Sequence, residues 1–360
     1  MTIVTEMIAV DRNQPDPSII GLAAHLLQNG GLVAFPTETV YGLGANALDA
    51  AAAQRIFVAK GRPAHDPLIV HVPDQSWLEQ LAVEIPDAAW RLSERFWPGA
   101  LTLVLRKRSQ VPDIVTAGGA TVAIRAPNHP VAQALIRAAQ LPIAAPSANR
   151  FSHTSPTTAR HVWDDLNGRI EMILDGGSTP IGVESTVIDV TGDVPLLLRP
   201  GGVPLEALRA VLGHVEQRVR QRSEQALPSP GMLDRHYAPT ASLWLFQGRP
   251  AEVSNQLLQT LESEQRNGRR VGVLLSEEDA ADLSLVAAQI MAGDRPGQLV
   301  VESLGSFDNL DEVAQRLFAA MRSLDAAGVE IILAHEFPVQ GLGLAINDRL
   351  RRAAERVIVL

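Results

Sequence analysis

The chain of 360 residues contains no cysteine. This absence excludes disulfides, thiolate zinc sites, iron–sulfur clusters and cysteine nucleophiles. No apolar run approaches the ~18 residues that a membrane-spanning helix needs. The first residues, MTIVTEMIAVDRNQ, also lack the basic region of a secretory signal. We therefore expect a cytoplasmic protein that does not associate with a membrane.

Lysine is almost absent, because only Lys60 and Lys107 occur among the 31 basic residues. Positive charge is in short supply as well, since the net charge is -9. Acidic residues outnumber basic ones by 20 to 16 through residue 210 and by 20 to 15 beyond it. Neither part resembles a basic nucleic-acid module, so stable binding of tRNA is not expected. Chance under the compositional bias is the simplest explanation of an isolated lysine. Evidence for a functional role must therefore come from the position of each lysine in the chain.

Several common catalytic motifs are missing too. The chain has no GxxxxGK[ST] phosphate loop, no HExxH and no GxSxG. Its nine histidines are scattered, and no pair of them stands at helix-face spacing together with a carboxylate, so we expect no protein-held metal ion.

What the chain does have is an alternation of short apolar runs with longer helical patterns, which indicates an α/β fold with a mixed sheet. The predicted strands of the first ~210 residues are Gly31–Phe35, Leu68–Val72, Leu101–Leu105, Thr121–Ile124, Ile143–Ala145, Met172–Leu174, Thr186–Val190 and Leu196–Arg199. The predicted helices are Pro17–Gln28, Ala50–Ala59, Pro86–Phe96, Pro130–Ala139 and Pro204–Arg222. The last two strands are close enough in sequence to form a hairpin.

The second part of the chain follows a proline-rich stretch that is typical of a linker. We divide the chain into a catalytic domain at 1–210, a linker at 211–241 and a smaller α/β domain at 242–360. In the smaller domain we predict strands Leu243–Phe246 and Arg270–Leu275 around helix Glu252–Glu264, then two further helix–strand units ending in Val357–Leu360.

Polar segments at the ends of the predicted strands carry the functional signal, because ligands of α/β sheets bind there. The first is PTETVYGLG, where Thr37, Glu38 and Thr39 follow a strand and Gly42 and Gly44 are expected to turn the chain. These residues fit either local turn capping or a rim of hydroxyls and one carboxylate over a small polar ligand.

The second segment is KGRP, which ends a predicted helix with Lys60 and Arg62. The helix macrodipole explains one cation at a helix C-terminus. Two cations around a glycine, stopped by a proline, fit a polyphosphate clamp better. The rare Lys60 therefore favours a functional role.

The third and fourth segments add hydroxyls and a further cation. In TVAIRAPNHP, Thr121 and Arg125 are expected at one strand end, with both side chains on one face. In APSANRFSHTSPTTA, Ser147 and Asn149 follow a buried strand, and Ser155 reads as the N-cap of a helix that starts at Pro156. Hydroxyls at a helix start beside cations fit a phosphate site, although capping alone also explains Ser155.

The fifth segment is the run from ESTVIDV to LLLRPGG. Ser185 and Thr186 open one strand, and Arg199 ends its partner after three leucines. An arginine at the mouth of a buried strand is a candidate anion site.

Together, KGRP, the later Ser147-Ala148-Asn149, PTETVYGLG, ESTV and the linker motifs SPGM and HYAP resemble the threonylcarbamoyl-AMP synthase family in its long form. The resemblance covers nearly the whole chain. It implies a YrdC-like catalytic domain with a twisted mixed sheet, followed by a smaller Rossmann-like domain. The implied reaction is nucleotidyl transfer: L-threonine, bicarbonate or CO2, and ATP give threonylcarbamoyl-AMP and pyrophosphate. The product would be handed to the machinery that makes the t6A modification of tRNA.

The resemblance also implies site residues. Those for threonine are Thr39, His71, Arg125 and Ser185. Those for ATP are Lys60, Arg62, Thr121, Ser147, Asn149, Ser155, Arg199 and Tyr237, with Lys60, Arg62, Ser147 and Asn149 as the catalytic set. Mg2+ is expected to arrive with the phosphates of ATP.

The chain departs from the family pattern at a few positions. Asp66 stands where the family usually has asparagine, and we place it provisionally in the ATP site. In the linker, Leu233 and Asp234 replace residues that are usually basic or aromatic. The alternative functions are an RNA-binding, translation-associated protein, which the negative charge disfavours, and a carbamoyl transferase, whose zinc-binding cysteines are missing.

Overall fold

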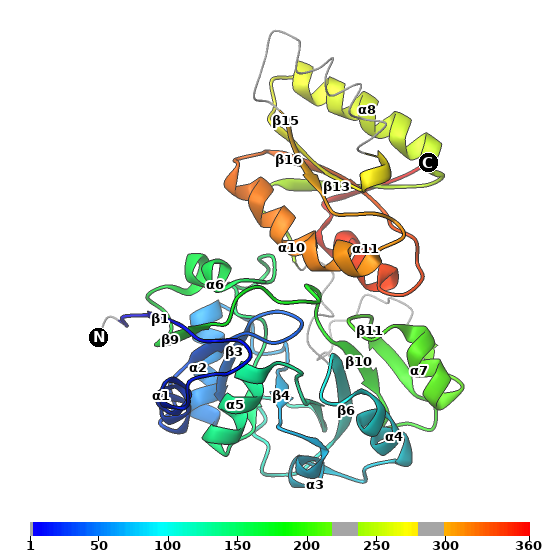
Figure 1. The fold of residues 1–360 in the computed structure, drawn as a ribbon. Coiled ribbons are helices and arrows are strands. Elements are labelled where there is room, and N and C mark those ends of the chain that lie inside the picture. The colour runs from blue at the N-terminus through cyan, green and yellow to red at the C-terminus, as the bar shows by residue number, and fades with distance from the viewer. Residues whose placement is uncertain (1–2, 218–236, 280–298) are drawn as a thin grey trace. The chain divides into compact units, whose positions relative to one another are not determined.

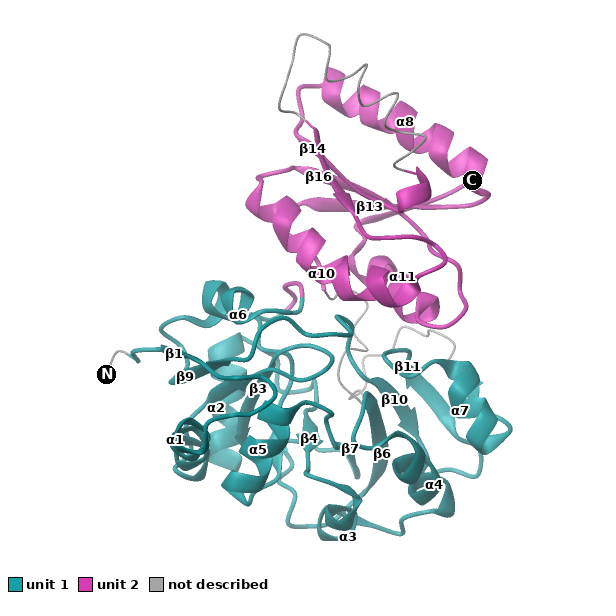
Figure 2. Ribbon diagram, viewed as in Figure 1, with its two compact units in different colours: residues 1–151, 155–233 teal, residues 152–154, 234–360 magenta. Residues whose placement is uncertain are grey.

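The computed structural model describes residues 3–217, 237–279 and 299–360. The chain forms two compact units, one of residues 1–151 and 155–233 and one of residues 152–154 and 234–360 (Figure 2). Unit 1 carries the candidate site residues other than Tyr237, and each unit is described by itself.

Unit 1 is built on a mixed sheet of twelve described strands (Figure 1). Its order is β1-β9-β2-β3-β8-β4-β7-β6-β10-β11-β12, with β5 paired to β6. The strands are β1 (Glu6–Ala9), β2 (Val33–Phe35), β3 (Gly42–Asn46), β4 (Ile69–His71), β5 (Ala82–Val83), β6 (Leu101–Lys107), β7 (Thr121–Arg125), β8 (Ile143–Ala144), β9 (Met172–Asp175), β10 (Thr186–Asp189), β11 (Leu196–Arg199) and β12 (Glu216–Gln217). Each strand predicted in this part of the chain overlaps one of these, and the β10–β11 hairpin is confirmed as antiparallel.

The helices of unit 1 follow local signals that are visible in the sequence. They are α1 (Pro17–Gln28), α2 (Ala50–Lys60), α3 (Leu78–Leu81), α4 (Asp87–Phe96), α5 (Pro130–Ala139), α6 (Ala159–Leu166) and α7 (Leu205–Leu212), with a short 3-10 helix at Gln75–Trp77. In α1, the Asp16 side chain accepts from the Ser18 N–H and Pro17 occupies the first turn. Apolar residues of α1 and α5 pack into one core with β2 and β9. These two helices therefore cover one face of this part of the sheet.

Predictions for two segments of unit 1 are wrong, in addition to two that concern residues of the candidate site. Gly42 and Gly44 do not turn the chain but lie inside β3, antiparallel to β2. A Cβ atom at Gly44 would meet Phe35 Cε1 at 2.8 Å and Ile143 Cγ2 at 2.9 Å, so close packing requires glycine here. The helix predicted over Pro204–Arg222 ends at Leu212, because Gly213 takes a positive φ of 80°.

Unit 2 contains a five-stranded sheet in the order β15-β14-β16-β13-β17, and all of its described pairings are parallel. The strands are β13 (Ser242–Gln247), β14 (Val271–Leu275), β15 (Leu299–Ser303), β16 (Ile331–His335) and β17 (Arg356–Val359). Helix α8 (Pro250–Arg266) covers one face, and α10 (Leu310–Ala326) and α11 (Gly343–Ala353) cover the other (Figure 1). The doubly wound α/β prediction is confirmed, and β15 is a strand that the sequence pattern did not reveal. No helix in the described part of the chain is long and apolar enough to cross a membrane.

Candidate active site

Two neighbouring parallel strands end in candidate residues. His71 ends β4 and lies opposite Arg125, which ends β7. His71 is buried, and burial together with the positive charge of Arg125 lowers its pKa to about 3. The imidazole is therefore neutral at physiological pH, and it can exchange hydrogen bonds with a ligand without repelling the guanidinium.

Thr121 lies at the other end of the same strand. It opens β7 whereas Arg125 closes it, so the expectation that both stand at one strand end is wrong. Their even spacing does place them on one face of the strand, about 13 Å apart along it at about 3.3 Å per residue. A role of Thr121 toward ATP remains a prediction.

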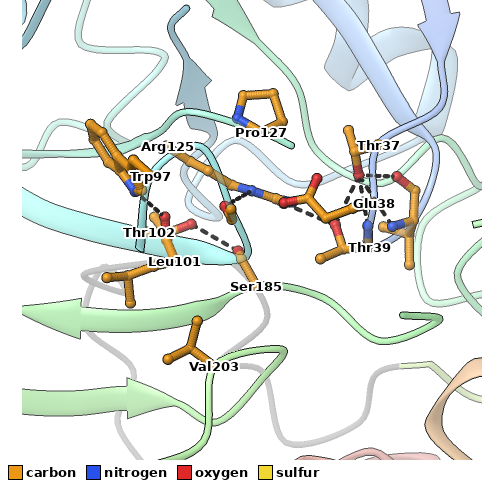
Figure 3. Close-up of polar contacts among 12 residues, drawn as sticks. Thr37, Glu38, Thr39, Trp97, Leu101, Thr102, Arg125, Pro127, Ser185 and Val203 are labelled. Atoms are coloured by element: carbon orange, nitrogen blue, oxygen red, sulfur yellow. Dashed lines mark hydrogen bonds and ion pairs between the residues drawn. The ribbon is translucent and has the colours of Figure 1, made fainter. Parts of the chain in front are cut away.

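The guanidinium of Arg125 is held by three residues from two segments, Gly99 and the adjacent pair Glu38–Thr39 (Figure 3). Its Nε donates to the Gly99 carbonyl at 3.2 Å, and its Nη1 donates to Thr39 Oγ1 at 2.9 Å. Its Nη2 lies 2.7 Å from a carboxylate oxygen of Glu38. Arg125 is buried and fixed in orientation, as a fork that binds a small carboxylate must be.

The Thr37–Thr39 turn that meets Arg125 is itself held rigidly. Thr37 Oγ1 donates to the Val40 carbonyl at 2.6 Å and accepts from the N–H groups of Thr39 and Val40. Thr37 and Thr39 also share a hydroxyl contact of 2.9 Å. These contacts show that turn capping occurs in this segment, and a rim of hydroxyls over a ligand stays a prediction.

Ser185 lies just before β10 and links two further candidates. Its hydroxyl is 2.8 Å from that of Thr102 and accepts from Arg199 Nη2 at 3.1 Å (Figure 3 shows the pair with Thr102). Arg199 also donates through Nε and Nη2 to the Ser185 carbonyl. Thr186 uses its hydroxyl differently, donating to the Val203 carbonyl at 2.6 Å. The buried Arg199 at the end of β11 is thus hydrogen-bonded to Ser185, which is predicted to bind the substrate threonine.

Lys60 is the last residue of α2 and is buried. Its ammonium donates to the backbone carbonyls of Ser147 and Asn149, both at 2.5 Å, and to Asn149 Oδ1 at 3.4 Å. Gly61 ends the helix with a positive φ of 65°, and this left-handed conformation turns the chain that follows away from the helix. Sequence-distant residues of the predicted catalytic set therefore meet at this one ammonium.

Arg62 lies two residues further on and closes a local loop. It donates to the carbonyls of Asp66 and Pro67, and its Nη2 pairs with Asp66 Oδ2 at 2.9 Å. Burial raises the pKa of Asp66, although Arg62 and Lys60 act to lower it. The departure from the family pattern at this position thus faces a cation.

Ser155 is not a helix cap. Helix α6 begins at Ala159, and Thr158 caps it by accepting from the His161 N–H. Ser155 Oγ instead donates to Glu184 at 2.5 Å, because Glu184, next to Ser185, provides a stronger, charged acceptor. The prediction that Pro156 starts a helix is wrong, and a phosphate site on that helix start falls with it.

Two buried residues lie outside the set that the resemblance implies: Glu38, which the sequence offered only as the carboxylate of the PTETVYGLG segment, and His129. Glu38 pairs with Arg125, a contact that no local spacing reveals. His129 was read only as a turn residue, yet it caps α5 by accepting from the Val131 N–H through Nδ1. Burial lowers the pKa of His129 to about 4. Its Nε2 has no hydrogen-bond partner among the described residues.

Tyr237 belongs to unit 2 and is buried there. Its ring stacks on Phe318 at 5.6 Å, and the Arg349 guanidinium lies 5.0 Å from the ring centre. Its carbonyl accepts from Thr154 Oγ1 at 3.4 Å. Leu233 and Asp234 lie outside the described residues.

Within the described ranges, no three His, Asp or Glu side chains gather closely enough to hold a metal ion. The polar residues instead form two groups. The carboxylate-binding group is Thr39, His71, Arg125 and Ser185, with Glu38 and Thr102 beside them. The cationic group is Lys60, Arg62 and Asp66 with the Ser147–Asn149 turn. One group suits a small amino acid or acid, and the other suits a polyanion.

Comparison with known proteins covers both parts of the chain. Residues 25–201 match a family model described as "Telomere recombination", and residues 203–355 match "Threonylcarbamoyl-AMP synthase, C-terminal domain". The chain is 49% identical over 342 residues to a threonylcarbamoyl-AMP synthase of Bacillus subtilis, covering 94% of this chain and 93% of that one. It is 47% identical over 337 residues to the synthase of Pyrococcus abyssi, covering 93% and 94%.

A solved structure is similar over almost the full length. The crystal structure of Pyrococcus abyssi Sua5 complexed with L-threonine superposes with a TM-score of 0.89 at 45% identity, covering 99% of each chain. The α/β architecture of both parts therefore has an experimental counterpart.

Proposed function

The chain belongs to the threonylcarbamoyl-AMP synthase family, and on this premise we propose that it condenses L-threonine, bicarbonate and ATP to threonylcarbamoyl-AMP and pyrophosphate. The observation that carries the proposal is the buried Arg125, fixed by contacts from two distant segments and flanked by the neutral His71. The solved structure of a relative with 45% identical sequence is a complex with L-threonine, and an amino acid is the ligand that the residues around Arg125 suit.

Arg125 is proposed to bind the threonine carboxylate through its planar fork. The neutral His71 and the hydroxyls of Thr39 and Ser185 supply hydrogen bonds to the rest of the amino acid. Holding the substrate in one orientation converts the later steps into reactions within a single complex, which accounts for much of the rate.

The first chemical step is carbamate formation. The threonine amine attacks the carbon of bicarbonate, a C–N bond forms, and water leaves. The resulting carbamate is an oxygen nucleophile, and it needs little further activation.

The second step is nucleotidyl transfer. A carbamate oxygen bonds to the α-phosphorus of ATP while the bond from that phosphorus to the bridging oxygen breaks, releasing pyrophosphate. Negative charge accumulates on the leaving group, so the main task of the protein is to neutralise it. We assign this role to Lys60, Arg62 and Arg199, with Thr121, Ser147, Asn149 and Ser155 binding other parts of ATP.

Lys60 also positions the Ser147–Asn149 turn through its bonds to two carbonyls. Asp66 neutralises part of the charge of Arg62 and keeps that side chain against its own loop. Mg2+, held by phosphate oxygens and water, would add charge neutralisation. We further propose that the product passes to the enzyme that transfers the threonylcarbamoyl group to tRNA.

The test is an omission assay on the full chain. Pyrophosphate is expected only when L-threonine, bicarbonate and ATP are all present. Lys107→Ala is the matched control for variants of Lys60. The Lys107 ammonium contacts the exposed Asp113 and lies outside both groups. Pyrophosphate release at the full rate without threonine would contradict the proposed substrate.

A further inference from the structure

Glu38 is a buried carboxylate with little to satisfy it. The residue is 5% exposed, and apart from its ion pair with Arg125, neither oxygen accepts a hydrogen bond from the residues that the structure describes. Burying a charged group costs free energy unless it is paired and hydrogen-bonded. A carboxylate with four lone-pair positions and one close cation retains capacity for a further positive or hydrogen-bonding group.

Two other carboxylates of unit 1 behave differently. Glu171 pairs with Arg55 and accepts from the Leu32 N–H at 2.9 Å. Glu184 accepts from Ser155 Oγ at 2.5 Å. These two groups are satisfied by the protein itself, whereas Asp66 resembles Glu38 in having a close arginine and oxygens that accept no hydrogen bond from the described residues. Glu38 differs from Asp66 in that its arginine also contacts Thr39.

The location of Glu38 says what the missing partner is. Its carboxylate and the hydroxyl of Thr39 flank the same guanidinium, that of Arg125 (Figure 3). An α-amino acid carries its carboxylate and its ammonium on one carbon atom. When the carboxylate is on Arg125, the ammonium must lie within reach of whatever stands directly beside the guanidinium.

We propose that Glu38 binds the α-ammonium group of the amino acid whose carboxylate sits on Arg125. This inference rests on the proposed function, because it assigns a second residue to the same substrate. Arg125 and Glu38 then form a complementary pair for a zwitterion, and the ammonium relieves the repulsion that two carboxylates on one guanidinium would otherwise suffer.

The pairing also sets specificity. A hydroxy acid without an amine presents only its carboxylate, which Glu38 repels. The carboxylate therefore both favours the amino acid and disfavours its deamino analogue.

Glu38 is equally placed to take a proton. The ammonium transfers one proton to a Glu38 oxygen, which leaves a neutral amine with a free electron pair. The amine attacks bicarbonate, the new C–N bond replaces a C–O bond, and the amine's second proton leaves with the hydroxide as water. The net products are the carbamate, water and one proton on Glu38, which then passes to solvent.

The test measures binding by calorimetry on the full chain with two ligands, L-threonine and its deamino analogue 3-hydroxybutanoate. Glu38→Gln is expected to weaken L-threonine binding by at least about tenfold, in line with the loss of a charge-assisted hydrogen bond. The affinity for 3-hydroxybutanoate should stay the same or rise. Glu171→Gln, which breaks a comparable ion pair elsewhere in unit 1, should change neither affinity.

Equal losses for both ligands would show that Glu38 only orients Arg125, and an undiminished affinity for L-threonine would also overturn the inference. If wild type fails to bind L-threonine at all, the proposed function itself fails. Should Glu38→Gln not fold, wild type still decides the matter, because it must bind L-threonine at least about tenfold more tightly than 3-hydroxybutanoate. Equal affinities of wild type for the two ligands would overturn the role of Glu38.

The proton step has its own readout. In Glu38→Gln the amine must lose its proton to solvent, so the turnover of the variant should rise more steeply with pH than that of wild type. Parallel pH profiles would contradict the proton transfer.

Discussion

Two buried arginine–carboxylate pairs in unit 1 look alike but are built differently. Arg62 and Asp66 are four residues apart, and Arg62 spends its remaining donors on the carbonyls of Asp66 and Pro67. Arg125 instead contacts Gly99 and the adjacent pair Glu38–Thr39, two segments that lie far from it and from each other in the sequence. The local pair fixes the shape of one loop. The long-range pair links the end of β7 to the Thr37–Thr39 turn. In both pairs the carboxylate oxygens accept no hydrogen bond from the described residues.

The same contrast separates the cationic group from the carboxylate-binding group. Lys60 is already held by two backbone carbonyls in the protein alone, so a bound triphosphate competes with the turn that Lys60 stabilises. Arg125 has a contact at each of its three nitrogens, but a guanidinium has five N–H groups, so two of them remain for a ligand. The following variants test whether the two groups act on different substrates.

The largest effect is expected in the cationic group. Lys60→Ala should lower pyrophosphate formation by about 10²–10³-fold, the usual loss for one charge-stabilising donor. Lys60→Arg should not fully restore the rate, because a planar fork replaces a compact ammonium that fits between two carbonyls. Full activity in Lys60→Arg would show that the lysine is incidental.

The next effect concerns the carboxylate-binding group. Arg125→Lys loses the fork that contacts Gly99, Thr39 and Glu38 at once. We expect the KM for L-threonine to rise about 100-fold, equivalent to one or two charge-assisted hydrogen bonds. The KM for ATP should change by less than about twofold, within the scatter of a site that keeps its contacts. Equal increases in both KM values would remove the distinction between the two groups.

A smaller effect appears in stability against pH. The pKa of His71 is about 3 in the folded protein, whereas the unfolded value is 6.5. Between these pH values the unfolded chain binds the additional proton, so folding stability rises with pH and is lost as the pH falls. At pH 4.5 the wild type should have lost about 2–3 kcal/mol relative to pH 7 beyond the loss in His71→Gln.

Urea unfolding of both proteins between pH 7 and 4.5 measures this difference. Matching curves for wild type and variant would mean that His71 is not held neutral by its surroundings, and its proposed role beside Arg125 would then need revision.

The smallest effect is expected at the other lysine. Lys107 Nζ contacts Asp113 at 2.5 Å, but the Asp113 side chain is 84% exposed. Such surface pairs contribute about 0–1 kcal/mol. Lys107→Arg should therefore leave turnover and the free energy of unfolding nearly unchanged. A loss comparable to that of Lys60→Arg would show that lysine itself, and not its position, matters in this arginine-rich chain.

The sequence predicted most of what depends on neighbouring residues. Helices α1 and α5 match their predicted bounds, because a capping residue followed by proline defines each start. Lys60 could be singled out because its helix end and its rarity are both visible in the sequence.

What the sequence could not predict depends on contacts between distant segments. Glu38 gains its significance from Arg125, and the neighbouring contact of Thr39 with Arg125 spans 86 residues. The sequence around Ser155 is typical of a helix cap, but the Ser155 hydroxyl instead donates a hydrogen bond to Glu184. Gly44 looks like a turn residue, and only the packing of Phe35 and Ile143 explains a glycine inside β3.

The proposed reaction joins the carbon of bicarbonate, one threonine molecule and AMP in a single product. The most direct measurement supplies isotope-labelled bicarbonate with L-threonine and ATP and identifies the nucleotide product by mass spectrometry. We predict a product containing one phosphate, one threonine and the labelled carbon, formed in equal amount to pyrophosphate. An adenylate of threonine without the labelled carbon would contradict the account.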